Sequence, residues 1–242
     1  MALWRRIEHG YVKPWLRSIK PWRKKAFAGV RVHYMKHLDG GGSSFGQDYI
    51  PVLRRWDMPK QGRAFEWCAG PGFIGFALLG SGMCETLCLA DINPQAVEAC
   101  RRTIGDNRLG ASVSVYHSDN LADIPPHEQW DLVVSNPPHF VDDLIGDLRA
   151  HDPQWRIHRG FYASVGAHLN PGAVLVLQEN NRGSTAETFR AMIEQSGLQI
   201  VFVHGGDPQR TPNDHFYYIG VMRRTDVPPD WVRRAAAGSC QR

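Results

Sequence analysis

Six residues, Ser-Asn-Pro-Pro-His-Phe at positions 135–140, follow directly on the apolar run 131–134. The two prolines end that strand because they lack a backbone N–H and fix φ. They also stiffen the turn that holds the side chains of Asn136 and His139. A rigid turn with an amide and an imidazole at the end of a buried strand indicates a site where a ligand could be bound or converted.

A glycine-rich turn follows the apolar segment that ends near Trp67. Gly70 and Gly72 let the backbone turn sharply and let a ligand approach it without interference from a Cβ atom. With Gly75 they fit the G-x-G-x-x-G spacing of a dinucleotide site. Glu66, however, would repel a pyrophosphate and attract an ammonium or sulfonium group. A purely structural turn is the alternative interpretation.

Two further polar groups fall where later strands should end. Asp91 lies 25 residues beyond Glu66 and could accept hydrogen bonds from both hydroxyls of a ribose. It could instead help to cap the helix that Asn93-Pro94 begins. Ser118-Asp119-Asn120 is suited to hydrogen-bonding an adenine edge, although Asp and Asn are also common loop residues.

Short apolar runs alternate with helical patterns from residue 63 onward. The runs predict strands at 64–68, 86–91, 112–117, 131–135, 173–178, 198–203 and 216–222. Such alternation predicts right-handed βαβ units, and therefore a mainly parallel sheet with helices on both faces. The last two strands have no helix between them, so one should be antiparallel. Ligands of such sheets bind at the carboxyl ends of the strands, which is where the polar groups fall.

The composition divides the chain into three parts. Residues 1–44 form a basic aromatic arm that repeats Lys-Pro-Trp seven residues apart, residues 45–225 form the main domain, and residues 226–242 form a tail that should be poorly ordered. Residues 1–40 carry a net charge of +8, so the remainder carries −4 of the total of +4. The arm could stack on bases and neutralise phosphates, clamp an acidic small molecule, or pack onto the body with its charges outward.

The composition also bounds the class of protein. With 43% hydrophobic and 21% charged residues, the chain is typical of soluble globular proteins. No apolar stretch approaches the ~20 residues that cross a bilayer, and the N-terminus lacks the apolar region of a signal peptide. We therefore expect a cytoplasmic protein with no membrane partner and reduced cysteines. His33 and His37 lack a third ligand, so we expect no metal. A homodimer is possible.

The order of these motifs along residues 45–224 resembles that of the class I S-adenosylmethionine-dependent methyltransferases. The Asn-Pro-Pro turn is similar to that of a branch that methylates planar nitrogen, such as the protein-glutamine and adenine-N6 methyltransferases and related ribosomal RNA enzymes. The resemblance implies a Rossmann-like α/β fold of seven strands, with an antiparallel last strand, and S-adenosylmethionine as cofactor. The cofactor-binding residues that it implies are Glu66, Cys68, Gly70, Gly72, Asp91, Ile92, Ser118, Asp119 and Asn136.

The resemblance also implies catalytic roles for the turn. In the family, the Asn side-chain oxygen and the carbonyl of the first proline accept hydrogen bonds from the target nitrogen, whose lone pair then faces the methyl group. Asn136 and Pro137 would take these roles. His139 stands where the family has Tyr or Phe, so His139 could stack on the substrate or remove its proton, or Phe140 could stack instead. Weaker candidates for substrate contacts are Tyr49, Phe140, His151, Trp155 and Glu179.

The arm is too short for a separate RNA-binding domain, and the body is slightly acidic. We therefore expect an N-methyltransferase that acts on a small molecule or a single side chain, with the arm as a lid. The alternative is methylation of a ribosomal or transfer RNA base, with the arm as a tether for the phosphate backbone. A non-catalytic methyltransferase-like scaffold subunit is a further alternative, and a nicotinamide oxidoreductase is disfavoured by Glu66 and the Asn-Pro-Pro turn.

Overall fold

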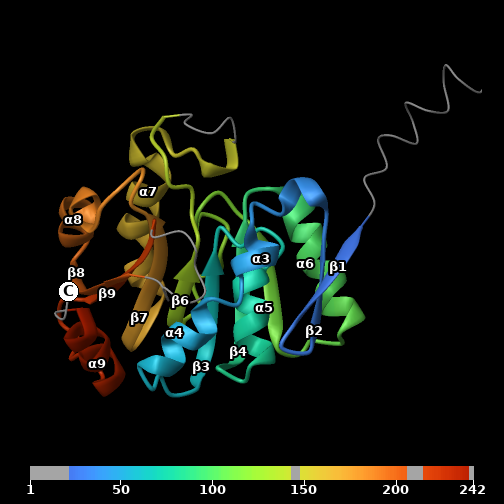
Figure 1. Ribbon diagram of the computed structural model, residues 1–242, viewed down its shortest axis with the longest axis horizontal. Helices are drawn as coiled ribbons and strands as arrows, with labels where there is room; N and C mark the ends of the chain where they lie inside the picture. The colour runs from blue at the N-terminus through green and yellow to red at the C-terminus, as the bar shows by residue number, and fades with distance from the viewer. Residues whose placement is uncertain (1–21, 143–147, 206–214, 240–242) are drawn as a thin grey trace, which may run out of the picture.

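A seven-stranded sheet forms the centre of the computed structural model, which describes residues 22–142, 148–205 and 215–239 (Figure 1). Its strand order is β5-β4-β3-β6-β7-β9-β8. The strands are β3 (Gln61–Trp67), β4 (Cys84–Asp91), β5 (Val113–His117), β6 (Trp130–Ser135), β7 (Leu169–Asn180), β8 (Leu198–Gly205) and β9 (Phe216–Arg223). Strands β3 to β7 pair in parallel, whereas β9 is antiparallel to β7 and to β8. This confirms the predicted Rossmann-like fold with an antiparallel last strand.

Helices cover both faces of the sheet (Figure 1). The helices α4 (Tyr49–Arg55), α5 (Phe73–Gly80), α6 (Pro94–Asp106) and α9 (Asp230–Ser239) contribute to one hydrophobic core, and α7 (Arg156–Val165) and α8 (Ala186–Gln195) contribute to the other. Successive strand residues point to opposite faces. Leu132 and Val134 of β6 therefore lie in the first core, and Val133 between them lies in the second. Among the described helices, none is long and apolar enough to cross a bilayer.

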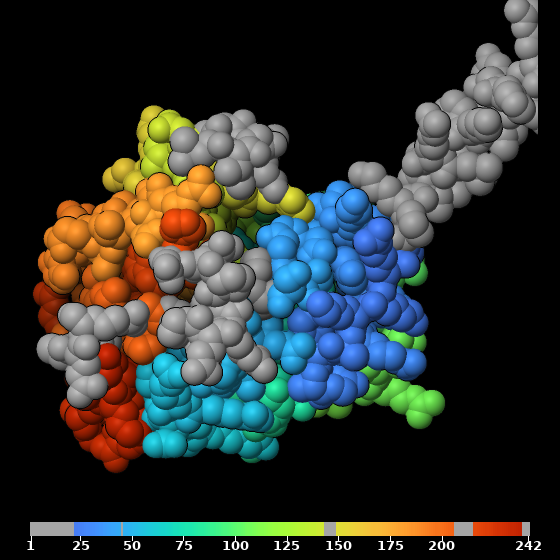
Figure 2. Space-filling view, viewed as in Figure 1, coloured from blue at the N-terminus to red at the C-terminus, as the bar shows by residue number. Residues whose placement is uncertain are grey.

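The described part of the basic arm is a hairpin that packs on the body (Figures 1 and 2). Strands β1 (Arg23–Phe27) and β2 (Val30–Tyr34) pair antiparallel, with Ala28 at φ 47° and Gly29 at φ 92° in the two-residue turn. Both residues at such a turn need positive φ. The hairpin buries Phe27 and Val32 against the helical layer and leaves its basic side chains exposed. Packing with charges outward thus describes residues 22–34, and residues 1–21 lie outside the described part.

The segment after the hairpin is ordered by its own hydrogen bonds. It contains the short helix α3 (Gly42–Phe45), whose residue Ser43 donates hydrogen bonds to Asp39 from both its backbone nitrogen and its hydroxyl. These contacts order a glycine-rich stretch that composition alone suggests is flexible. The segment thereby reaches the carboxyl edge of the sheet in a defined conformation.

The tail expected to be poorly ordered contains α9, an amphipathic helix. Trp231, Val232 and Ala235 are buried in the first core, and the ring of Trp231 stacks on Trp56 at a centroid distance of 6.4 Å. These three residues fall on one helical face, which gives the tail an apolar surface to bury. The prediction was therefore wrong for residues 230–239.

Candidate active site

A cavity of about 530 Å³ lies outside the carboxyl ends of β3, β4 and β6. The strand order reverses between β3 and β6, and open sheets of this type bind ligands at that point. The structure brings most of the predicted site residues together there. Those that line the cavity are Glu66, Cys68, Gly70, Asp91, Ile92, Ser118, Asp119, Asn136, Pro137, His139, Phe140 and His151.

Glu66 is a buried carboxylate in the cavity wall at the end of β3. Its two oxygens accept hydrogen bonds from the backbone nitrogens of Ile74, at 3.3 Å, and Gly75, at 2.6 Å. Burial nevertheless raises the pKa of Glu66 to about 8. A cation bound beside this group would favour its ionised form, since opposite charges stabilise one another most where water is excluded.

The glycine turn has a second role besides admitting a ligand. Gly70 lines the cavity at φ 52°, but Gly72 is not among the lining residues. A Cβ atom at Gly72 would lie 2.7 Å from the ring of Phe76. Gly72 is the N-cap residue of α5 and has a φ of 80°. Gly72 is thus required by the packing of the turn, which differs from the predicted contact with cofactor. Cys68 lies in the same turn, and burial raises the pKa of its thiol well above the usual value.

Asp91 is fixed by two backbone donors at the end of β4. Its Oδ2 accepts from the nitrogen of Gly70 and its Oδ1 from that of Asn93, both at 2.7 Å. Because a carboxylate oxygen has two lone pairs, each retains one for a ligand hydroxyl. The cap of α6 is instead Asn93, whose side chain accepts from the nitrogen of Gln95 at 2.9 Å. The adjacent Ile92 is 57% exposed.

The loop after β5 contributes one side chain that is available to bind a ligand, that of Asp119. Ser118 is buried and its hydroxyl accepts from the nitrogen of Asp123 at 3.0 Å. Asn120 is held by the indole of Trp67 at 2.8 Å and by the carbonyl of Ile157 at 2.9 Å. Asp119 is half-exposed at the cavity, with a loose ion pair to Arg156 at 3.7 Å. Sequence reasoning missed Arg156, which also lines the cavity.

The Asn136 side-chain oxygen is buried and has no hydrogen-bond partner among the described residues. Buried polar atoms in native proteins are nearly always bonded, and an unsatisfied one costs about 1–3 kcal/mol. The strand end before it is rigid, because the Ser135 hydroxyl donates to the carbonyl of Trp67 at 2.5 Å. A rigid cavity wall therefore presents one open acceptor.

Tyr49 does not contact the cavity, contrary to our expectation. It is fully buried, and its hydroxyl lies 2.6 Å from the carbonyl oxygen of Ser135 and 3.0 Å from that of Val176. These contacts tie α4 to the end of β6 and to the interior of β7. Tyr49 thus fixes the strand that carries the Asn-Pro-Pro turn.

Trp155 and Glu179 also lie behind the cavity, since neither is among its lining residues. Trp155 packs edge-on against the rings of His158 and Phe189, with centroid distances of 5.4 and 5.0 Å. Glu179 is fully buried and bonded to His158. The prediction of direct substrate contacts is wrong for both, because packing turns their side chains inward. Sequence reasoning missed His158, which no local motif singles out.

The other predicted substrate contacts do reach the cavity. Phe140 and His151 line it, and they pair with each other through an isolated backbone bridge. The Nε2 atom of His151 lies 2.5 Å from the carbonyl of Val141. Among the described residues, no group of three or more His, Cys, Asp or Glu side chains is arranged to hold a metal ion.

The fold and the cavity define a class I methyltransferase architecture. The family model described as "Methyltransferase small domain" matches residues 49–199. The chain belongs to this family, which makes it an S-adenosylmethionine-dependent methyltransferase.

Curated relatives match part of this chain. Ribosomal RNA small subunit methyltransferase C of Actinobacillus pleuropneumoniae is 31% identical over 154 residues, which cover 64% of this chain and 42% of that protein. Release factor glutamine methyltransferase of Neisseria gonorrhoeae is 32% identical over 108 residues, which cover 43% of this chain and 38% of that protein. The chain thus spans about two fifths of the length of these relatives.

A solved structure supports the fold. The 16S rRNA N2 G1207 methyltransferase of T. thermophilus, in complex with AdoMet and guanosine, matches 84% of this chain and 50% of its own, with a TM-score of 0.56. The sequence identity is 15%, so this likeness concerns the fold alone.

The ribosomal RNA methyltransferases among these relatives contradict our expectation of a small-molecule or side-chain substrate. Such methyltransferases recur among the relatives, from Actinobacillus pleuropneumoniae and from Haemophilus influenzae, and they favour the RNA alternative. Our expectation assumed that RNA needs a separate binding domain. A basic hairpin that packs on the main domain weakens that assumption, because it carries exposed basic side chains without being a separate domain.

Proposed function

We propose that this protein transfers a methyl group from S-adenosylmethionine to a nitrogen of an RNA base. The observation that carries the proposal is the buried, unpartnered oxygen of Asn136 in the cavity wall. An N–H group of a base would supply the missing donor. The Asn-Pro-Pro turn thus supports an acceptor of the planar nitrogen type.

The cofactor would lie along the ends of β3, β4 and β5. Glu66 offers a negative charge for its cationic part, Asp91 offers two oxygens for the ribose hydroxyls, and Asp119 offers an acceptor near the adenine. When bound, the cofactor supplies the methyl group on a sulfonium. The residues on the other side of the cavity would then hold the base.

The turn would orient the reacting nitrogen. The lone pair of an sp² nitrogen is delocalised, which makes it a poor nucleophile. Hydrogen bonds from its N–H groups to Asn136 Oδ1 and the carbonyl of Pro137 would draw electron density onto the nitrogen and aim the lone pair at the methyl carbon. Both acceptors lie in a rigid turn, so little reorganisation is needed on binding.

The basic hairpin supports RNA as the carrier of that base. Arg23, Lys24, Lys25 and Arg31 are exposed on β1 and β2. The segment that follows the hairpin, including Leu38 and Asp39, lines the cavity. A phosphate backbone bound along the hairpin could therefore place one of its bases in the cavity, and lysine and arginine contacts would make that binding salt-dependent.

The test is methyl transfer from labelled cofactor to RNA. The purified protein should label ribosomal or transfer RNA, and digestion of the product should yield a nucleoside methylated on nitrogen. Protein and small-metabolite fractions serve as competing acceptors in the same assay. Label that enters one of those fractions and not RNA would refute the proposal.

A further inference from the structure

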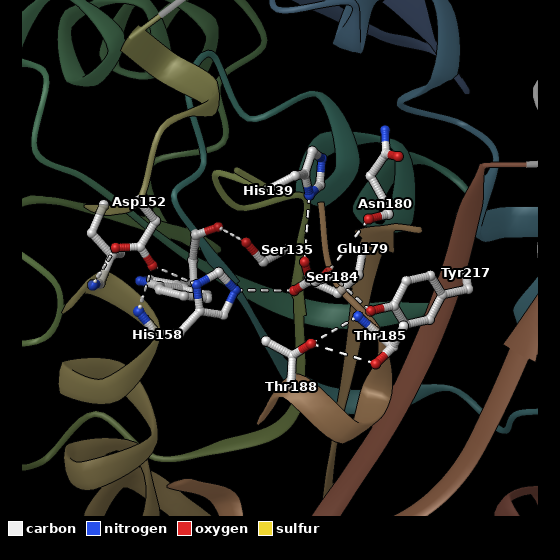
Figure 3. Close-up of polar contacts among 12 residues, drawn as sticks. Ser135, His139, Asp152, His158, Glu179, Asn180, Ser184, Thr185, Thr188 and Tyr217 are labelled. Carbon is white, nitrogen blue, oxygen red and sulfur yellow. Dashed lines mark hydrogen bonds and ion pairs between the residues drawn. The ribbon is translucent and has the colours of Figure 1, made fainter. Parts of the chain in front are cut away.

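Four titratable side chains form a continuous chain from the interior to the cavity (Figure 3). His158 Nδ1 lies 2.7 Å from Asp152 Oδ2, and His158 Nε2 lies 3.1 Å from Glu179 Oε1. The other oxygen of Glu179 lies 3.4 Å from His139 Nδ1. The first three residues are fully buried, whereas His139 lines the cavity next to the Asn-Pro-Pro turn.

Several elements hold this chain in place. Asp152 also accepts hydrogen bonds from the backbone nitrogens of Ile157, at 2.8 Å, and His158, at 3.1 Å, at the start of α7. The ring of His158 stacks on Phe189 of α8 at a centroid distance of 4.6 Å. Glu179 comes from β7. The geometry of the four groups is thus set by the packing of both helices on the sheet.

His158 is an imidazolium in this arrangement. Each of its ring nitrogens faces a carboxylate, which accepts hydrogen bonds, so both nitrogens carry a proton. Burial alone would lower the pKa of His158, but the charge of Glu179 and the bonds to both carboxylates raise it to about 9. Burial likewise opposes ionisation of Glu179, but the charge of His158 holds the pKa of Glu179 below its usual value. Two carboxylates and one imidazolium leave one buried negative charge.

That negative charge faces His139. Since the Glu179 carboxylate needs a donor, Nδ1 of His139 carries a proton, and in the neutral ring Nε2 keeps a free lone pair. The other ring contacts of His139 are the edges of Phe140 and Phe216, at centroid distances of 6.1 and 5.9 Å. Among the described residues, Glu179 is the charged group in contact with His139. A proton that arrives at Nε2 would therefore neutralise the buried charge.

We propose that His139 accepts the proton that leaves the substrate nitrogen, and that Glu179, His158 and Asp152 are positioning residues that hold its ring in the accepting state. This inference rests on the proposed N-methyl transfer. The nitrogen lone pair attacks the methyl carbon, and the carbon–sulfur bond breaks with its electron pair passing to sulfur. The proton on the nitrogen passes to Nε2 of His139 and then to water.

The first test separates proton transfer from stacking. His139→Phe keeps an aromatic ring but removes the base, so turnover should fall about 100-fold at saturating cofactor, while calorimetric affinity for cofactor stays unchanged. His139→Ala should be equally slow and should regain at least tenfold in rate with added imidazole. His127→Ala, at an exposed histidine, is the control. It should keep the wild-type turnover and should gain no rate from added imidazole.

The second test addresses the positioning residues through the pH profile of turnover. A base must be unprotonated, so the wild-type rate should rise with pH along an acid limb that His139→Phe lacks. Glu179→Gln removes the negative charge, and the ring should hold its proton less tightly. The acid limb should therefore move to lower pH. A purely structural role would lower the rate without moving the limb.

The outcomes distinguish this inference from the proposed function. Wild-type labelling of RNA combined with a fully active His139→Phe variant would overturn the inference and leave the function standing. No transfer to RNA by the wild type would overturn both. If Glu179→Gln does not fold, as judged by circular dichroism, the loss of rate in His139→Phe and the rescue of His139→Ala by imidazole still decide whether His139 accepts the proton.

Discussion

Most polar side chains at the cavity are held by backbone groups of the turns that carry them. Glu66 and Asp91 each accept two backbone N–H bonds, and Ser118 accepts one. Such side chains meet a ligand without first being ordered. Asn136 differs, because its oxygen has no partner among the described residues. These residues therefore predict different outcomes when they are replaced.

Asn136→Ala should reduce turnover about 100-fold or more, because an acceptor that acts on the reacting nitrogen is lost. Cofactor affinity should remain close to that of the wild type. Since the removed oxygen is unpartnered, the free energy of unfolding should change by less than about 1 kcal/mol. Steady-state kinetics and urea denaturation measure these quantities. A fully active variant would remove Asn136 from the proposed mechanism.

Asp91→Ala should weaken cofactor binding at least tenfold, which corresponds to about 1.4 kcal/mol. The reason is the loss of two oxygens proposed to accept from the ribose. Isothermal titration calorimetry gives the dissociation constant. Asp123→Ala, at an exposed carboxylate nearby, is the matched control and should bind as the wild type does. Equal affinity in the two variants would refute the ribose assignment.

Glu66 should release a proton when the cofactor binds. With its pKa raised to about 8, the carboxyl is largely protonated at pH 7 in the free protein, and a cation beside it favours ionisation. Calorimetry at pH 7 in buffers with different ionisation enthalpies should show release of close to one proton. Glu66→Gln should abolish this dependence on buffer. A buffer-independent enthalpy in the wild type would contradict the proposed role.

The same raised pKa affects stability. A group whose pKa is higher in the folded state contributes stability that is full below its unfolded pKa and is lost as the pH rises through the folded value. The wild type should therefore lose stability between about pH 4.5 and 8, and Glu66→Gln should lose less. Denaturation midpoints across this range would test the sign.

At the scale of elements, the β1–β2 hairpin joins the basic surface to the core. Its Phe27 ring lies 5.4 Å from that of Phe73 in α5, and β2 donates a backbone hydrogen bond from His33 to Thr103 of α6. The cavity-lining segment 38–42 begins a few residues after β2. The hairpin therefore helps to position one side of the site, and its removal would damage more than substrate binding.

Phe27→Ala should lower the free energy of unfolding by about 3–5 kcal/mol, because a buried ring is replaced by a cavity. Arg23→Ala, at an exposed position in the same strand, is the control and should change it by less than about 0.5 kcal/mol. Chemical denaturation of both variants provides the comparison. Equal stability of the two would show that the hairpin does not contribute to the core.

At the scale of the whole molecule, the distribution of charge should decide how RNA is bound. Arg23→Glu combined with Lys25→Glu should weaken RNA binding and reduce the slope of log affinity against log salt by about one for each lost phosphate contact. Lys60→Glu is the control, because it changes the charge with the same sign at the amino end of β3, away from the cavity at the carboxyl end. Equal losses in the two variants would indicate a general charge effect.

Local residue patterns were sufficient to predict the sheet, the polar strand ends and the family. Proline and glycine restrict φ locally, and apolar periodicity reports burial locally, so strands such as β4 and the turns at Gly70 and Asn136 could be predicted without knowledge of their neighbours. Parallel topology then placed these turns at one edge of the sheet. The cavity residues predicted at those turns follow from this logic.

Which side chains face the cavity, and which face each other, depends on tertiary packing. Tyr49, Trp155 and Glu179 turn inward, and Glu179 meets a histidine 21 residues away. The hairpin and α9 likewise acquire their order from core contacts with helices and strands distant in sequence. Such partners depend on how helices pack on the sheet, and local residue pattern carries no information about that packing.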